Sequence, residues 1–177
     1  MDLAIAIGQG VGLAIACGLV ALLPLAVGSL GAMAGIVPGA LGVYDDVAVA
    51  VGTAVAGLVN AALSPRITGT FKILLAAGAG AAVFQLSAGE EVPYAGLAIG
   101  AVLGAAAAWV ASRIVDPAAA KGNAGGIAAF VAGAGLVAAG IALIPFAGYL
   151  LVLVAAWFGR RARRAQDRKY AGLRVLR

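Results

Sequence analysis

The sequence predicts an all-α, polytopic transmembrane helical bundle of about six spans arranged as three tandem helical hairpins. Three observations lead to this fold class. First, 64% of the 177 residues are hydrophobic and only 11% are charged, whereas about 25% of the residues in a soluble domain are charged. Second, apolar stretches long enough to cross a bilayer follow one another along the chain. Third, the few charges between residues 3 and 159 change sign from cluster to cluster.

The charge clusters predict on which side of the membrane each turn lies. In chain order they are Asp45 and Asp46, Arg66 and Lys72, Glu90 and Glu91, and then Arg113, Asp116 and Lys121. Eight of the twelve Lys and Arg residues follow residue 159. Because Lys and Arg gather on the cytoplasmic side, we expect the acidic turns to face outward. A transmembrane domain over residues 1–159 and a basic cytoplasmic tail over residues 160–177 follow, with both termini cytoplasmic.

The apolar stretches give the spans in order. Residues 3–37 are too long for one span, and Pro24 within them is expected to kink or interrupt the helix. This stretch is either one long kinked span or a re-entrant pair. Residues 47–63, 67–87 and 94–112 each have the length of a single span.

The last stretch, residues 125–158, is expected to cross twice. Basic residues precede and follow it, and a single crossing would leave one basic group outside. The turn is expected at Pro145, which lacks a backbone donor. An internal repeat supports it, because residues 92–96 (VPYAG) and 144–148 (IPFAG) match by residue type. Pro93 and Pro145 are therefore each expected to begin a helix that runs inward, with Pro38 in a looser third copy.

Small and polar residues mark expected helix contacts. Gly96, Gly100 and Gly104 fall on one face of one helix, and such a row lets two helices approach closely in lipid. The uncharged polar residues Gln9, Asn60 and Gln85 lie within apolar stretches. They are expected either to hydrogen-bond between helices, at about 1 kcal/mol each, or to line a narrow polar path.

The composition excludes several classes of function. The chain has no histidine and a single cysteine, Cys17, within an apolar stretch. No nucleophile–base pair or metal-ligand spacing can be assembled, so we expect no enzyme, cofactor or metal site. The positive charge is concentrated in the tail, which argues against a nucleic-acid partner. The expected partners are the lipid bilayer and either further copies of the chain, as a homo-oligomer, or other membrane subunits.

Two segments carry a resemblance to a known family. The stretch from Gly12 to Leu19, followed by Leu22-Leu23-Pro24-Leu25, resembles the opening of an uncharacterised family of small bacterial integral membrane proteins, a domain of unknown function. Ser64-Pro65-Arg66 with Gly69 is similar to a second segment of that family, although there the arginine is expected before the proline. The resemblance covers residues 8–115. It implies a bacterial inner membrane and no particular activity.

Two classes of function remain open at the level of the sequence. One is a small channel or transporter for a neutral or lipid-like solute, supported by the repeat and by the proline-interrupted first stretch. The other is an accessory or scaffold subunit of a larger membrane complex, supported by the nearly charge-free helices and the basic tail.

Overall fold

The computed structural model describes residues 3–37, 46–89, 92–119 and 124–174. These residues form seven α-helices and one short 3₁₀ helix, with no strand among them, so the all-α prediction is confirmed. The helices are α1 (Leu3–Cys17), α2 (Leu23–Met33), α3 (Val47–Leu63), the 3₁₀ helix η1 (Ser64–Arg66), α4 (Gly69–Ala88), α5 (Pro93–Ala119), α6 (Ala124–Ala142) and α7 (Ala147–Arg174).

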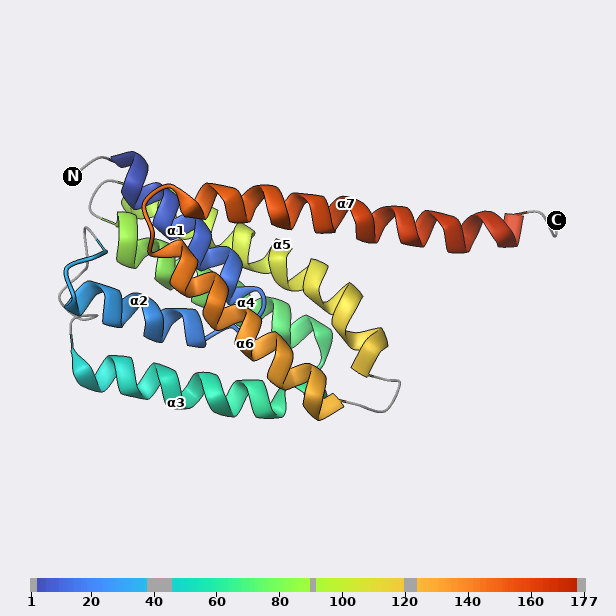
Figure 1. The fold of residues 1–177 in the computed structure, drawn as a ribbon, viewed down its shortest axis with the longest axis horizontal. Helices are drawn as coiled ribbons and strands as arrows, with labels where there is room; N and C mark the ends of the chain where they lie inside the picture. The colour runs from blue at the N-terminus through green and yellow to red at the C-terminus, as the bar shows by residue number, and fades with distance from the viewer. Residues whose placement is uncertain (1–2, 38–45, 90–91, 120–123, 175–177) are drawn as a thin grey trace.

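Successive α-helices alternate in direction along the bundle (Figure 1). The odd-numbered helices begin at the end where Asp46 caps α3, which we call the Asp46 end. The even-numbered helices begin at the opposite end, which carries Arg66 and is called the Arg66 end. Because the described residues form seven α-helices, an odd number, α1 begins at the Asp46 end and α7 finishes beyond the Arg66 end (Figure 1).

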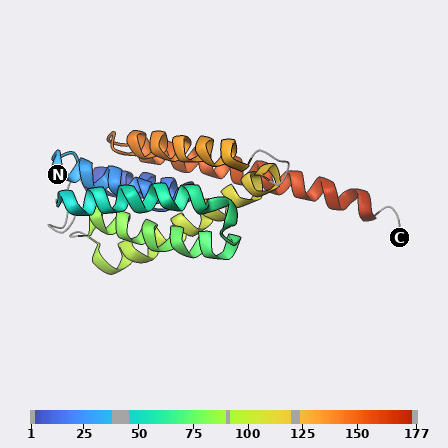
Figure 2. The same ribbon diagram turned by 90° about the horizontal axis from the view of Figure 1, so that it is seen from below.

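The first two helices form the centre of the bundle. Figure 2 shows α1 and α2 between a layer of α6 and α7 on one side and a layer of α4 and α5 on the other. α1 packs against α4, α5, α6 and α7, and α2 packs against α3, α4 and α6. Nearly every residue of α1 after Ile7 is buried. An apolar helix that is buried all round is a core element rather than a lipid-facing one.

The long first stretch forms two short antiparallel helices, so it is not one long kinked helix (Figure 1). α1 has 15 residues and α2 has 11, so they rise about 22 Å and about 16 Å, each shorter than a bilayer core of about 30 Å. Pro24 lies in the first turn of α2 and cannot donate the hydrogen bond that would continue α1. The chain reverses over residues 18–22, which we call the hairpin tip.

The far end of α2 is closed by a glycine. Gly35 has a left-handed φ of 69°, a conformation that glycine adopts without the steric cost that a Cβ imposes. The Ile36 N–H donates to the Gly31 carbonyl at 2.8 Å, the bond that characterises a Schellman ending. This ending turns the chain out of α2 at the Asp46 end.

The number of spans needs correction. Three helices among the described residues are long and apolar enough to cross a membrane: Gly69–Ala88, Tyr94–Ala118 and Ala124–Ala142. α1, α2 and α3 are apolar but shorter, and in α7 the arginines from Arg160 onward follow 13 apolar or small residues. Six helices of full spanning length are not found in the described ranges. The first stretch divides into two short helices, α3 has 17 residues, and α7 has 13 residues before its arginines. The coarser prediction stands, because the described regular structure is helical and three of the helices are long and apolar enough to cross a membrane.

Both described prolines of the repeat lie at helix boundaries, but only Pro93 begins a helix as predicted. α5 begins at Pro93, and α6 and α7 are separated by residues 143–146, which include Pro145. The last apolar stretch thus folds back on itself as predicted. Pro38 lies outside the described residues. α6 and α7 contact each other only slightly, because each packs mainly against α1. α7 continues as one helix through residues 160–174, so the basic tail extends a bundle helix (Figure 1).

Glycines bring α1 against its neighbours. A methyl group on Gly8 would lie 2.8 Å from a ring carbon of Tyr149 on α7, and one on Gly12 would lie 2.8 Å from Gly148 Cα. A methyl group on Gly18, in the hairpin tip, would meet the backbone of α5 at Ala108. Such close approach increases van der Waals contact between the helices. In lipid this contact drives helix association, because the hydrophobic effect does not act between helices there.

The predicted glycine row of α5 faces α4. A methyl group on Gly100 would fall on the Gly80 carbonyl oxygen, and one on Gly104 would fall on the Ala76 carbonyl oxygen. A methyl group on Gly96 would lie 3.0 Å from the Phe84 ring. The backbones of α4 and α5 therefore touch along this row, and these two helices make the most extensive contact in the bundle.

Two glycines of α4 give a matched test of this contact. Gly80 faces the Gly100 carbonyl, whereas Gly78 has nothing within 4 Å of an added methyl group. We expect Gly80→Ala to destabilise the protein by about 1–3 kcal/mol, because overpacking forces the two backbones apart. Gly78→Ala should be neutral or stabilising by up to about 1 kcal/mol, because alanine favours a helix over glycine. Thermal unfolding in detergent measures both. Equal losses from the two variants would contradict the close α4–α5 contact.

Candidate functional site

A hollow of about 290 Å³ lies beneath the hairpin tip on the Arg66 side. The tip residues Leu19 and Val20 contribute to its lining. The remaining lining comes from α3, from η1 and the residue after it, from the first turn of α4, from the end of α5 and from α6. These residues are Asn60, Ala61, Ser64, Ile67, Lys72, Val115, Asp116, Ala124, Ile127, Ala128 and Val131. The hollow exists because α1 and α2 stop short, so the surrounding helices continue past the tip without a central element.

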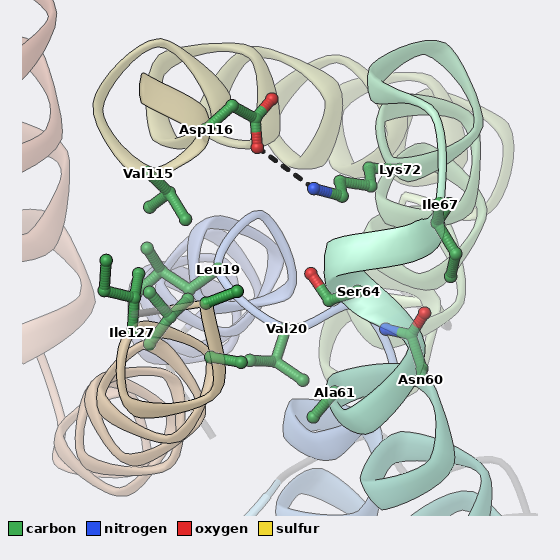
Figure 3. Close-up of a pocket in the computed structure, with 13 residues that line it drawn as sticks. Leu19, Val20, Asn60, Ala61, Ser64, Ile67, Lys72, Val115, Asp116 and Ile127 are labelled. Carbon is green, nitrogen blue, oxygen red and sulfur yellow. Dashed lines mark hydrogen bonds and ion pairs between the residues drawn. The ribbon is translucent and has the colours of Figure 1, made fainter. Parts of the chain in front are cut away.

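Its rim carries an ion pair between two helices. Lys72 Nζ and Asp116 Oδ1 are 3.0 Å apart, joining the first turn of α4 to the last turns of α5 (Figure 3). The side chains are 23% and 44% exposed, respectively, so the pair contributes only about 0–1 kcal/mol to stability. Its main effect on the hollow is electrostatic, because the opposite charges leave the lining with no net charge.

Uncharged polar groups supply hydrogen-bonding capacity. Asn60 and Ser64 line the hollow on the α3 side, and the lining on the α6 side, including Ile127, is apolar (Figure 3). An adjoining hollow of about 50 Å³ shares Asn60, Ser64 and the ion pair and reaches inward to Cys17 and Ser112. An amide and hydroxyls both donate and accept hydrogen bonds. The site can therefore bind a small uncharged molecule through polar atoms on one side and apolar contacts on the other.

The described residues hold no cluster of metal-ligating side chains. Among them, no group of three or more His, Cys, Asp or Glu side chains could hold a metal ion. Cys17 is fully buried at the end of α1.

Gln9 joins three helices away from this hollow. Its side chain is 1% exposed, and its Nε2 donates to the Leu143 carbonyl at 2.8 Å and to the Ile36 carbonyl at 3.2 Å. These carbonyls follow the ends of α6 and α2, where helix carbonyls lack intrahelical partners. Of the two roles expected for it, Gln9 therefore takes that of helix–helix contact and fixes α1 at the Asp46 end.

The three predicted polar residues do not form one path. Asn60 lines the hollow, whereas Gln9 is bonded at the opposite end of the bundle. Gln85 Nε2 makes one long hydrogen bond of 3.5 Å to the Gly89 carbonyl just beyond its own helix. Its Oε1 is buried without a hydrogen-bond partner among the described residues.

Sequence reasoning missed Ser64, Lys72, Asp116 and the hairpin tip as site residues. One signal was present, because Asp116 is an acidic residue between the basic residues Arg113 and Lys121. A carboxylate at a basic turn indicates a partner on a neighbouring helix. The partner itself was hidden, because Lys72 lies 44 residues away in sequence.

Comparison with known protein families, curated proteins and solved structures finds no match to this chain.

The Gln9 contacts give a second prediction. Gln9→Met keeps the side-chain length but leaves the Ile36 and Leu143 carbonyls without this donor, which should cost about 1–3 kcal/mol. Gln85→Met is the matched control, because its one bond of 3.5 Å exceeds the usual hydrogen-bond length, and it should cost less. Chemical unfolding of both variants in detergent measures the difference. A larger loss for Gln85→Met would refute the bridging role of Gln9.

Proposed function

We propose that this chain is a small permeation protein, a channel or carrier for a small neutral solute, embedded in a bacterial inner membrane. Support for the embedding comes from the three helices of spanning length and from the outer faces of the bundle. Large apolar side chains are exposed along the outer helices, among them Val51, Val55 and Leu58 on α3, Val102 on α5 and Val137 on α6. Exposed apolar surface of this extent is suited to contact with lipid.

The proposed topology has five crossings and one re-entrant hairpin. α4, α5 and α6 cross at full spanning length. α3 and the apolar first half of α7 are shorter, and they cross where the bilayer thins or the arginines of α7 snorkel. α1 and α2 form a hairpin that enters and leaves from the Asp46 side. The Arg66 end is cytoplasmic by the positive-inside rule. Arg66 lies in η1, Lys72 in the first turn of α4 and Arg113 in the last two turns of α5. The arginines of α7 follow its apolar first half. The C-terminal tail is then cytoplasmic, as the sequence predicts, but the N-terminus faces outward.

The main support for this function is the break between α1 and α2, which lies beside a hollow that has polar groups in its lining. Discontinuous helices whose ends face a cavity recur at transport sites, because their terminal backbone groups can interact with a solute. Here the end of α1 and the start of α2 meet at the hairpin tip, whose Leu19 and Val20 line the hollow. Irregular backbone at membrane depth is tolerated where it is buried in protein or lines a cavity, and the tip satisfies both conditions.

The solute class follows from the lining. A volume of about 290 Å³ lies at the lower limit of ordinary ligand pockets, so the solute is small. The internally neutralised pair of Lys72 and Asp116 disfavours a net charge on it. Asn60 and Ser64 beside Ile127 and Val131 favour a solute with both hydroxyl or amide groups and apolar carbon. A lipid-like solute would use the same apolar side.

A second function is favoured by α7. This helix continues well beyond the other helices as a basic rod (Figure 1), with Arg160, Arg161, Arg163 and Arg164 exposed. A projecting basic helix is suited to docking on an acidic partner, as expected of an accessory subunit. In that case the hollow would be a packing defect without a transport role.

A pair of neighbouring alanines on α6 tests the permeation function. Ala128 lines the hollow, whereas Ala129 is exposed and does not. The wild-type protein in liposomes is expected to accelerate glycerol or urea entry, measured by light scattering, without potassium leakage. Ala128→Trp should reduce this rate severalfold by filling the hollow. Ala129→Trp should leave it unchanged, because tryptophan is well accommodated at a membrane interface.

Two outcomes would overturn this function. Equal rates for protein-containing and empty liposomes would exclude permeation of these solutes. An equal loss from the two tryptophan variants would show that the hollow is not the path. Purification of the chain with a fixed set of other membrane subunits, together with no flux, would favour the accessory function instead.

A further inference from the structure

A second hollow lies between α5 and α7, on the outside of the bundle. It is a groove of about 370 Å³ with Ile15 of α1 among its lining residues. Its walls are apolar, with Leu103 and Val110 from α5 and Val152 from α7. We call this the α5–α7 groove.

The groove is open because the facing residues are small. Ala106 and Ala107 on α5 face Ala155, Ala156 and Gly159 on α7 across it. These two helices contact each other far less than α4 and α5 do. The groove opens to the outside of the bundle, where lipid acyl chains lie when the bundle is in a bilayer.

One end of the groove is basic. Arg160 and Arg163 line it there, and a spacing of three residues places them on one side of α7. Neither has a carboxylate partner among the described side chains. Trp109 also lines the groove, with the Arg113 guanidinium 4.8 Å from its ring centre. Tryptophan and arginine mark the level of the lipid headgroups, so the basic end lies where lipid phosphates are found.

We propose that the α5–α7 groove binds one anionic phospholipid, with an acyl chain along its apolar walls and the phosphate against Arg160 and Arg163. The combination of a narrow apolar slot and two arginines at its mouth matches this ligand class. The anionic lipids of the cytoplasmic leaflet attract such residues at about 1 kcal/mol each. The inference rests on the placement of the bundle in a bilayer and is independent of solute permeation.

The two arginine pairs of α7 provide a matched test. R160Q/R163Q removes the groove arginines. R161Q/R164Q removes two neighbours that do not line the groove, of which Arg161 lies over the Trp157 ring at 5.6 Å. Both double variants lose the same charge. Detergent-purified proteins are exposed to phosphatidylglycerol or phosphatidylcholine, and bound lipid is counted by native mass spectrometry.

The wild-type protein should retain phosphatidylglycerol over phosphatidylcholine by about tenfold or more, given two arginines near the phosphate. R160Q/R163Q should lose this preference, and R161Q/R164Q should keep most of it. Equal losses from the two variants would show diffuse attraction and overturn the site. Binding of soluble glycerol phosphate as tightly as phosphatidylglycerol would also overturn it, since the acyl chain would then contribute nothing.

A variant that keeps both arginines tests the apolar part. Ala106→Leu narrows the groove and should reduce phosphatidylglycerol retention, whereas unchanged retention would contradict an acyl chain in it. Solute flux, measured on the same variants, separates this inference from the proposed function. Loss of lipid retention in the groove variants with normal flux would support the lipid site without bearing on permeation. Normal lipid retention without flux would instead contradict only the permeation function.

Discussion

Close contact between the α1 backbone and its neighbours is the constraint on which the rest of the bundle depends. Gly8, Gly10, Gly12 and Gly18 leave no room for a side chain against α7, α4, α6 and α5. Helices in lipid associate through van der Waals contact, and four packed neighbours supply it on every side. The Gln9 bonds to the ends of α2 and α6 then fix the position of α1 along the bundle axis. A short helix with no lipid-facing side is stable here because it is enclosed in this way.

This enclosure determines both the direction of the chain and the place of the hollow. A single helix in the first apolar stretch would give six α-helices, and both ends of the bundle chain would then lie at the same end. Reversal at residues 18–22 makes two helices of this stretch, so the start of α1 and the end of α7 lie at opposite ends (Figure 1). The same reversal stops the central element short of the Arg66 end, where the outer helices enclose Asn60, Ser64 and the Lys72–Asp116 pair. The candidate site is thus a consequence of how α1 packs.

Much of the outer bundle is predictable from local signals, whereas the centre is not. Pro93 and Pro145 mark helix starts or turns because proline cannot donate within a helix, and the α5 glycines indicate close packing by their spacing. After Gly18 the tip consists of Leu19, Val20, Ala21 and Leu22. None of these four is a polar residue of the kind that is common in water-exposed turns. Buried turns need no such residues, so only Gly18 and Pro24 hint at the reversal. The Lys72–Asp116 pair depends on α4 packing against α5, which charge order alone does not reveal.

Sidedness of the first helix tests the central claim most directly. In a Cys17→Ala background, Leu3→Cys places one thiol at the start of α1, where the side chain is 44% exposed. An impermeant maleimide is applied to intact spheroplasts and to inverted membrane vesicles, with Thr68→Cys as the marker of the Arg66 side. The re-entrant hairpin predicts that Leu3→Cys is labelled from outside and Thr68→Cys only in inverted vesicles. Labelling of both from the same side would mean that the first apolar stretch crosses the membrane, which would contradict the re-entrant hairpin.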